Sequence, residues 1–191
     1  MFPAEIFRDT LTRLIPVLTR HAVRFHLTGG ITSVAYGEPR MTQDIDIVVD
    51  NAALARGLDD FLAAAAQAGF LLDPAAVRRA VAERSMFQLF DMAEALKIDI
   101  YPREMIPGEL DRSARIELFV GLSLPVVSRP DAAASKLAWA AKGSAKSRRD
   151  LRHMVRLMPP ADRNELDRLA GSLGLDALLA VILAEADEIA G

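Results

Sequence analysis

The sequence predicts an α+β protein in which a small mixed β-sheet flanked by helices is followed by a lobe of helices alone. Two observations predict this class. Short apolar segments typical of strands occur between residues 24 and 127, whereas every periodic segment after residue 130 has the spacing of a helix. The change falls at Ser128-Arg129-Pro130. We therefore expect a first domain over residues 1–128 and a helical second domain over residues 129–191.

The first half of the chain is predicted to alternate helices and strands. Apolar residues three and four positions apart indicate the first helix, and Gly37 and Pro39 end a short second one. Asn51 is the expected N-cap of a long helix that ends before Gly69. The predicted elements are helices over residues 4–20, 31–36 and 51–67 and strands over residues 24–27 and 44–50.

The second half begins with strands and ends with helices. A polar helix precedes two alternating strands, and a hairpin turns at Gly121. Beyond the hairpin, Gly143, Pro159-Pro160 and Gly174 separate four helical segments. The predicted elements are a helix over residues 78–84, strands over residues 86–90, 96–101, 116–120 and 124–127, and helices over residues 131–142, 148–158, 162–173 and 176–189.

Composition narrows the classes of function. The chain has 191 residues and no cysteine, which excludes disulfides and thiolate metal sites. It has neither a signal-peptide pattern nor an apolar run of about 18 residues, so we expect a cytoplasmic protein without membrane contact. The net charge of -3 excludes a general attraction to nucleic acid. The three histidines lack zinc-ligand spacing, and His26 is expected to be packed in the interior.

Two carboxylates lie side by side on the strand over residues 44–50. Asp44 and Asp46 are two residues apart and so share one face of the strand. They repel each other unless a cation lies between them, and Mg²⁺ with oxygen ligands meets that need. Asp99 alternates with Ile98 and Ile100 in the same way. If the two strands pair, three carboxylates converge on two metal ions about 3.5–4 Å apart, which suits phosphoryl or nucleotidyl transfer.

A glycine turn precedes the acidic strand. Gly29-Gly30 lies between a strand and a helix, where backbone N–H groups unshielded by side chains can bind a phosphate. Ser33 offers a hydroxyl one turn later, and Arg40 and Thr42 lie just before Asp44. The glycines, Arg40 and the aspartates also have explanations that involve no ligand. The glycines provide positive φ for the turn, Arg40 forms a loop salt bridge, and the aspartates are solvated positions on half-exposed strands.

The helical lobe adds two candidates and a cationic run. Lys136 lies in an apolar helix, where a lysine either extends to water or points at an anion. Asp150 has capping-box spacing with Ser147, so it either caps a helix start or belongs to a site. The cationic run is a candidate contact for an RNA backbone, and its alternative is a solvated helix face. The run comprises Lys142, Lys146, Arg148, Arg149, Arg152, His153 and Arg156.

Taken together, these motifs resemble the nucleotidyltransferase fold of the DNA polymerase beta superfamily. They are most similar to its minimal prokaryotic members, the AbiEii-like toxin–antitoxin group, over about residues 20–155. The motifs are Gly29-Gly30, then Arg40-x-Thr42-x-Asp44-Ile45-Asp46-Ile47, then Ile98-Asp99-Ile100. Gly30 departs from the serine that many members have at this position.

The resemblance implies a catalytic domain over residues 1–128 and an enzyme that moves NMP from an NTP to a hydroxyl of RNA, such as a tRNA end, or of a protein side chain. It implies Mg²⁺ or Mn²⁺ as cofactor and a cognate toxin or antitoxin as a partner. The implied site residues are Asp44, Asp46 and Asp99 for the metal, Gly29, Gly30, Ser33, Arg40 and Thr42 for the nucleotide, and Lys136 and Asp150 as further catalytic residues.

Two other functions fit the same residues. One is a weakly active or inactive antitoxin of the same fold that binds a partner protein, although such a module has no need of a complete acidic trio. The other is a metal-dependent phosphoesterase, which leaves the glycine turn and Lys136 less well explained. The base of the NTP, the acceptor and the toxin or antitoxin role stay open at this point.

Overall fold

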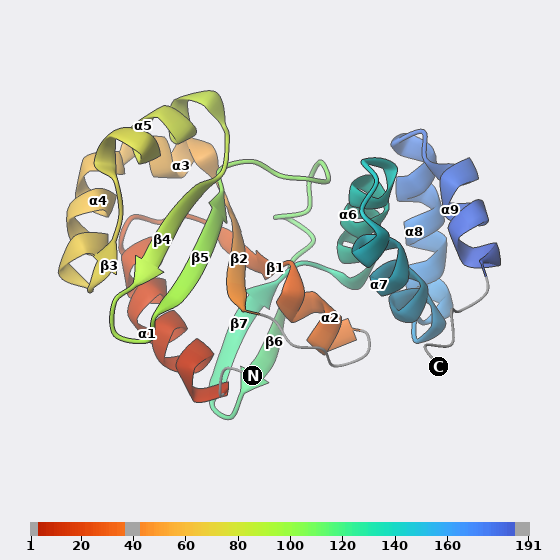
Figure 1. Cartoon of the computed structure of the whole chain (residues 1–191), viewed down its shortest axis with the longest axis horizontal. Coiled ribbons are helices and arrows are strands. Elements are labelled where there is room, and N and C mark those ends of the chain that lie inside the picture. Colours follow the sequence, from red (N-terminus) through yellow and green to blue (C-terminus); the bar gives the residue numbers. More distant parts are fainter. Residues whose placement is uncertain (1–3, 37–42, 186–191) are drawn as a thin grey trace.

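The computed structural model describes residues 4–36 and 43–185, and these build one mixed β-sheet with helices around it (Figure 1). The strands of this part lie in the order β3-β4-β5-β2-β1-β7-β6. β2 pairs with β5, and β1 with β7, in parallel, whereas the other neighbours are antiparallel. The strands are β1 (Phe25–Thr28), β2 (Asp44–Val49), β3 (Phe70–Leu71), β4 (Phe87–Asp91), β5 (Leu96–Tyr101), β6 (Ala114–Phe119) and β7 (Leu122–Val126).

The helices form two groups. In Figure 1, α1, α3, α4 and α5 surround the end of the sheet that carries β3, β4 and β5, and α6 to α9 stand together beyond the other end. None of the helices in the described ranges is long and apolar enough to cross a membrane. The helices are α1 (Ala4–Arg20), α2 (Gly30–Tyr36), α3 (Asn51–Arg56), α4 (Leu58–Gln67), α5 (Pro74–Glu83), α6 (Arg129–Ala141), α7 (Ala145–Arg156), α8 (Pro160–Ser172) and α9 (Asp176–Ala184).

The predicted fold class is confirmed, with local differences. The helix predicted over residues 51–67 is two helices, because the chain breaks at Gly57. Its N-cap is Asp50 rather than Asn51, since the Asp50 carboxylate accepts hydrogen bonds from two backbone N–H groups of α3 at 2.9 and 3.2 Å. Strand β3 has no counterpart in the sequence prediction, because two residues are too few for a period-2 pattern. The predicted helix end at residues 186–189 lies outside the described residues.

The two faces of the sheet differ in polarity. Ile45, Ile47 and Val49 of β2 and Ile98 and Ile100 of β5 are at most 2% exposed and belong to the hydrophobic core, as their alternation predicts. Residues of the other parity therefore share the opposite face. They are Asp44, Asp46 and Val48 on β2, Lys97, Asp99 and Tyr101 on β5, Gln88 and Phe90 on β4, and His26 and Thr28 on β1.

The segment between β5 and β6, residues 102–113, connects the sheet to the C-terminal helices. In Figure 1 it lies between β5 and α6. The Arg112 guanidinium donates hydrogen bonds to the buried carboxylate of Asp131 in the first turn of α6. Arg112 Nε is 3.0 Å from Asp131 Oδ2, and Arg112 Nη2 is 2.6 Å from Asp131 Oδ1. Ser128 caps the same turn, because its Oγ accepts from the Asp131 N–H at 3.3 Å. These contacts fasten the start of α6 to the segment beside the polar face.

Candidate active site

The three predicted metal-ligand carboxylates lie on neighbouring strands. The parallel register of β2 and β5 places Asp46 opposite Asp99 and Asp44 opposite Lys97. All four side chains project from the polar face. Asp99 is only 6% exposed, and Asp44 and Asp46 are half-buried. Strand pairing thus brings together the carboxylates that the sequence spacing alone left apart.

An ammonium lies between two of these carboxylates. Lys97 Nζ is 2.8 Å from Asp99 Oδ2 and 3.5 Å from Asp44 Oδ2. The second Asp99 oxygen accepts a hydrogen bond from Gln88 Nε2 of β4 at 3.0 Å. Within residues 4–36 and 43–185, no group of three histidine or acidic side chains is arranged ready to hold a metal ion. The ammonium therefore supplies positive charge where the sequence pattern indicated a metal.

Asp46 has a different environment, with only neutral donors among the described residues. The Tyr101 hydroxyl donates to its Oδ1 at 3.3 Å, and the Gly30 N–H approaches its Oδ2 at 3.4 Å. Burial, followed by the negative charges of Asp44 and Asp99, raises the pKa of Asp46 to about 6. Negative charge is therefore concentrated at the trio, whose possible metal ligands are all carboxylate oxygens. This donor set fits a divalent cation once Lys97 moves aside.

The turn between β1 and α2 approaches Asp46 closely. Gly29 has a φ of +66°, and α2 begins at Gly30. A Cβ atom added to Gly29 would lie 1.8 Å from Asp46 Oδ2, which no side chain can tolerate. Thr32 Oγ1 donates to the Gly29 carbonyl at 2.7 Å and closes the turn. Gly29 is therefore required both for the left-handed backbone and for the close contact with the carboxylate.

A pocket joins this turn to the helical lobe. It has a volume of about 50 Å³, which is far smaller than the several hundred Å³ of a typical ligand site. A nucleotide could therefore place only a few atoms inside it and must extend outward. The lining residues are Thr28, Gly29, Thr32, Asp46, Val48, Tyr101 and Met105 on the sheet side and Ala132, Ser135, Lys136 and Trp139 on α6.

Lys136 of α6 lines the pocket and forms an ion pair with Asp150. Its Nζ is 3.2 Å from Asp150 Oδ2, and the two side chains are 12% and 5% exposed. The interpretation of Asp150 as a helix cap is wrong. Helix α7 begins at Ala145, and the Ser144 hydroxyl caps it by accepting from the Ser147 N–H at 3.2 Å. Asp150 lies inside α7 and anchors the Lys136 ammonium beside the pocket.

The remaining predicted nucleotide contacts are only partly described. Ser33 belongs to α2, whereas Arg40 and Thr42 lie outside the described residues. The structure also adds site residues that the sequence analysis missed, namely Gln88, Lys97, Tyr101, Met105 and Trp139. The alternation that marks Asp99 already placed Lys97 and Tyr101 on its face. The other three depend on strand register, on the path of the segment 102–113 and on the position of α6, for which the sequence holds no local signal.

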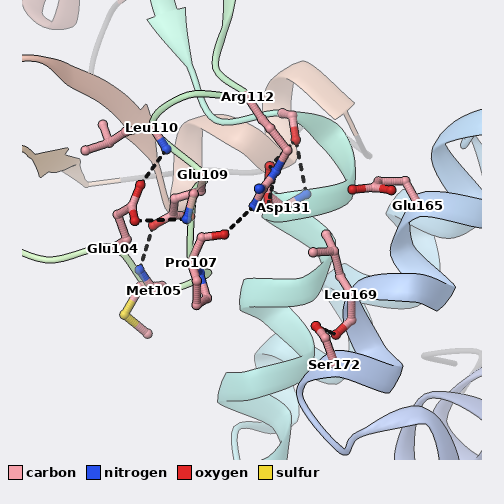
Figure 2. A network of polar contacts seen from close by, with 12 residues as sticks. Glu104, Met105, Pro107, Glu109, Leu110, Arg112, Asp131, Glu165, Leu169 and Ser172 are labelled. Atoms are coloured by element: carbon pink, nitrogen blue, oxygen red, sulfur yellow. Dashed lines mark hydrogen bonds and ion pairs between the residues drawn. The ribbon is translucent and has the colours of Figure 1, made fainter.

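A polar network holds the pocket-lining segment 102–113 in place (Figure 2). The Glu109 carboxylate, 1% exposed, accepts a hydrogen bond from the Met105 N–H at 2.6 Å. The Glu104 carboxylate accepts from the N–H groups of Gly108 and Leu110, both at 2.9 Å. Because Met105 lines the pocket, these two carboxylates set the position of one pocket wall.

His26 lies fully buried behind this segment, as the sequence analysis expected. Its Nδ1 is 2.8 Å from Ser113 Oγ, and its Nε2 has no hydrogen-bond partner among the described residues. That Nε2 lies 3.9 Å from Glu109 Oε2. Burial lowers the pKa of His26 to about 4 and raises the pKa of Glu109 to about 7. Both groups are thus favoured in their neutral forms.

Replacing Glu109 by glutamine is expected to change how stability depends on pH. The folded protein holds the Glu109 proton more tightly than the unfolded chain, so the wild type loses stability as the pH rises from about 4.5 to about 7. Glutamine mimics the neutral acid and keeps the acceptor for Met105. Urea unfolding should find Glu109→Gln more stable than the wild type by about 2 kcal/mol at pH 8, with the advantage gone at pH 4.5. An equal difference at both pH values would contradict the buried neutral state.

Several solved structures have a similar overall fold. The antibiotic-resistance factor ANT(2'')-Ia is 11% identical with a TM-score of 0.51, covering 96% of this chain and 91% of that one. The antigenic nucleotidyltransferase-like protein from Paracoccidioides brasiliensis is 16% identical with a TM-score of 0.52 (94% and 93%). The lincomycin-bound lincosamide antibiotic adenylyltransferase LnuA is 14% identical with a TM-score of 0.52 (82% and 98%). These similarities define a nucleotidyltransferase fold.

Sequence comparison identifies the family. Residues 17–180 match the family described as nucleotidyl transferase AbiEii toxin, type IV toxin–antitoxin system. No curated protein matches the sequence. The match covers most of the chain, which therefore belongs to the AbiEii family and is a nucleotidyltransferase.

Proposed function

We propose that this chain is a metal-dependent enzyme that moves NMP from an NTP to a hydroxyl of RNA, such as a tRNA end, or of a protein side chain. One observation carries the proposal. Asp46 from the sheet, Gly29 from the turn and Lys136 from the helical lobe line a single pocket. Transfer from a triphosphate needs carboxylates that bind a metal, backbone N–H groups that bind phosphate, and a positively charged side chain. The residues of this pocket can supply all three. The family's type IV toxin–antitoxin context supports a role in such a system.

Asp44, Asp46 and Asp99 are the residues that would hold Mg²⁺ or Mn²⁺. Their all-oxygen donor set supports this assignment, as does the pKa of Asp46, which burial and then the charges of Asp44 and Asp99 raise to about 6. A metal ion held there would lower the pKa of the attacking hydroxyl and offset the charge of the departing pyrophosphate. Asp99 helps to take the hydroxyl proton.

The triphosphate lies along the turn and the lobe. Gly29 and Gly30 present backbone N–H groups to it, and the Ser33 hydroxyl, with Arg40 and Thr42, adds contacts. The acceptor oxygen forms a bond to the α-phosphorus while the bond from that phosphorus to the β-bridging oxygen breaks, and pyrophosphate leaves. Lys136 offsets the negative charge that develops on the phosphates.

Replacing Lys136 by methionine is expected to lower the rate of NMP transfer about 100-fold, because one preorganised charge is lost from the transition state. Lys136→Arg should recover only part of the rate, since a guanidinium does not match the position of the ammonium beside Asp150. Arg79→Met is the control for loss of a positive charge. Arg79 is exposed on α5 and does not line the pocket, so its loss should leave the rate within about twofold. Steady-state transfer kinetics of the three variants test this.

We also propose that the two domains have different roles. Residues 1–128 carry the carboxylates, and residues 129–191 supply Lys136 and an RNA-binding face. Two members of the cationic run form ion pairs with Glu185. Arg148 pairs with Glu185, and Arg152 Nη1 lies 2.5 Å from a Glu185 oxygen. RNA phosphates would meet the run near the pocket at Lys142, which lies over the pocket-lining Trp139.

The proposal is tested by incubating the protein with each NTP, total RNA and cell lysate, with Mg²⁺ or with EDTA. The expected result is incorporation of label into an RNA or protein band from α-labelled but not γ-labelled NTP, and only with Mg²⁺. Hydrolysis without incorporation would support the phosphoesterase instead. Absence of any NTP effect, together with a stable complex with a partner protein, would support the inactive antitoxin.

A further inference from the structure

Lys97 occupies the space between the carboxylates that the proposed function assigns to metal. It lies opposite Asp44 in the β2–β5 register and two residues before Asp99 on the same strand. Its ammonium reaches one oxygen of each, at 3.5 and 2.8 Å. The side chain is 40% exposed, so it has room to swing into solvent. Lys97 is thus both engaged with the carboxylates and free to leave them.

The contacts of Lys97 and a divalent ion exclude each other. A Mg²⁺ ion needs carboxylate oxygens at about 2.1 Å in octahedral order. Here Asp99 has one oxygen on the Lys97 ammonium and the other on the Gln88 amide. The oxygen held by Lys97 must be released before it can become a metal ligand, whereas the Gln88 hydrogen bond to the other oxygen can remain. Charge adds to the argument, since the Lys97 ammonium between Asp99 and Asp44 repels a divalent cation that approaches the same oxygens.

We propose that Lys97 is a built-in counter-ion that competes with the divalent cation for Asp44 and Asp99. In the metal-free protein its ammonium holds the two carboxylates together and limits their repulsion. Metal binding displaces it, so the site fills only when the cation is abundant or arrives with the triphosphate. This inference rests on the proposed metal-dependent function. It means that a side chain of the protein itself weakens the binding of the metal.

The test is calorimetric Mg²⁺ titration of the nucleotide-free protein, alongside Lys97→Met and Lys97→Arg. Lys97→Met should bind Mg²⁺ about fivefold more tightly than the wild type, because no ammonium has to be displaced. Lys97→Arg keeps the competing charge and should stay close to the wild type. Thermal unfolding provides a second readout. Lys97→Met should melt lower than the wild type without metal and gain more from added Mg²⁺.

Arg103→Met is the control for a general change in charge. Arg103 is exposed just beyond β5 and forms no ion pair with the described residues, so its loss should leave Mg²⁺ affinity within twofold of the wild type. Equal or weaker Mg²⁺ binding by Lys97→Met, or an equal gain by Arg103→Met, would overturn the inference. If the wild type also transfers NMP in that case, only the inference falls. If no variant binds Mg²⁺ and no NMP is transferred, the proposed function falls with it.

Discussion

Replacing Asp46 by asparagine is expected to lower NMP transfer by about 10³-fold while leaving the fold intact. Asp46 lines the pocket with Gly29 and Lys136, and its hydrogen-bond donors among the described residues are neutral groups. Asparagine keeps the volume and an acceptor for Tyr101 but removes the charge that a metal and a triphosphate require. It also removes like-charge repulsion with Asp44 and Asp99. The variant should therefore unfold at the same urea concentration as the wild type or a higher one.

The control for this substitution is Asp59→Asn. Asp59 is an exposed acid of α4 that pairs with Arg78, and α4 packs against α1 and β3. Its transfer rate should stay within about twofold of the wild type. Wild-type rates for Asp46→Asn would show that the trio does not carry the chemistry. A loss of rate accompanied by loss of folding would be resolved by Asp44→Asn, for which the same 10³-fold effect is expected.

Replacing Gly29 by alanine should cost both stability and activity. The backbone at Gly29 is left-handed, with φ +66°, and an added Cβ would overlap Asp46 Oδ2. Strain at such a position costs about 1–3 kcal/mol of the free energy of unfolding. Pushing the Asp46 carboxylate aside by an ångström or more should reduce the transfer rate at least 100-fold. Urea unfolding and transfer kinetics on the same preparation measure the two effects.

Gly121→Ala separates these two causes. Gly121 also has positive φ, at +77°, but lies in the β6–β7 turn with no atom within 4 Å of an added Cβ. It should lose a similar amount of stability through backbone strain alone and keep the wild-type transfer rate. Should Gly29→Ala behave like Gly121→Ala, the contact between the turn and Asp46 would have no role in activity.

The sequence predicted the parts of the site that strand alternation determines. Asp44, Asp46 and Asp99 required only period-2 geometry inside apolar strands, and the structure pairs those strands. The contacts of Lys97 could not be foreseen, because alternation gives the face on which its side chain lies but not which carboxylates a long flexible side chain will reach. Gln88 reaches Asp99 through the register of β4, which is set by long-range pairing.

Helix ends and tertiary contacts account for the other differences. Asp50 and Asn51 are both good N-cap residues, and only the observed hydrogen bonds identify Asp50. Asp150 fitted a capping pattern by its spacing from Ser147, but Ser144 is the cap and Asp150 pairs with Lys136 across two helices. The pocket wall formed by residues 102–113 depends on the buried carboxylates of Glu109 and Asp131. The burial of these two acids, one in the segment and one in the first turn of α6, has no local sequence signal.

The central claim is that the carboxylate trio, the glycine turn and Lys136 form one metal–triphosphate site. A crystal structure of the protein with Mn²⁺ and a non-hydrolysable NTP analogue tests it most directly, since anomalous scattering locates the ion. The predicted result is a Mn²⁺ peak about 2.1 Å from oxygens of Asp44 and Asp46, with the triphosphate between Gly29 and Lys136 and the Lys97 ammonium withdrawn. Metal or triphosphate bound away from these residues, with Lys97 still between Asp44 and Asp99, would contradict it.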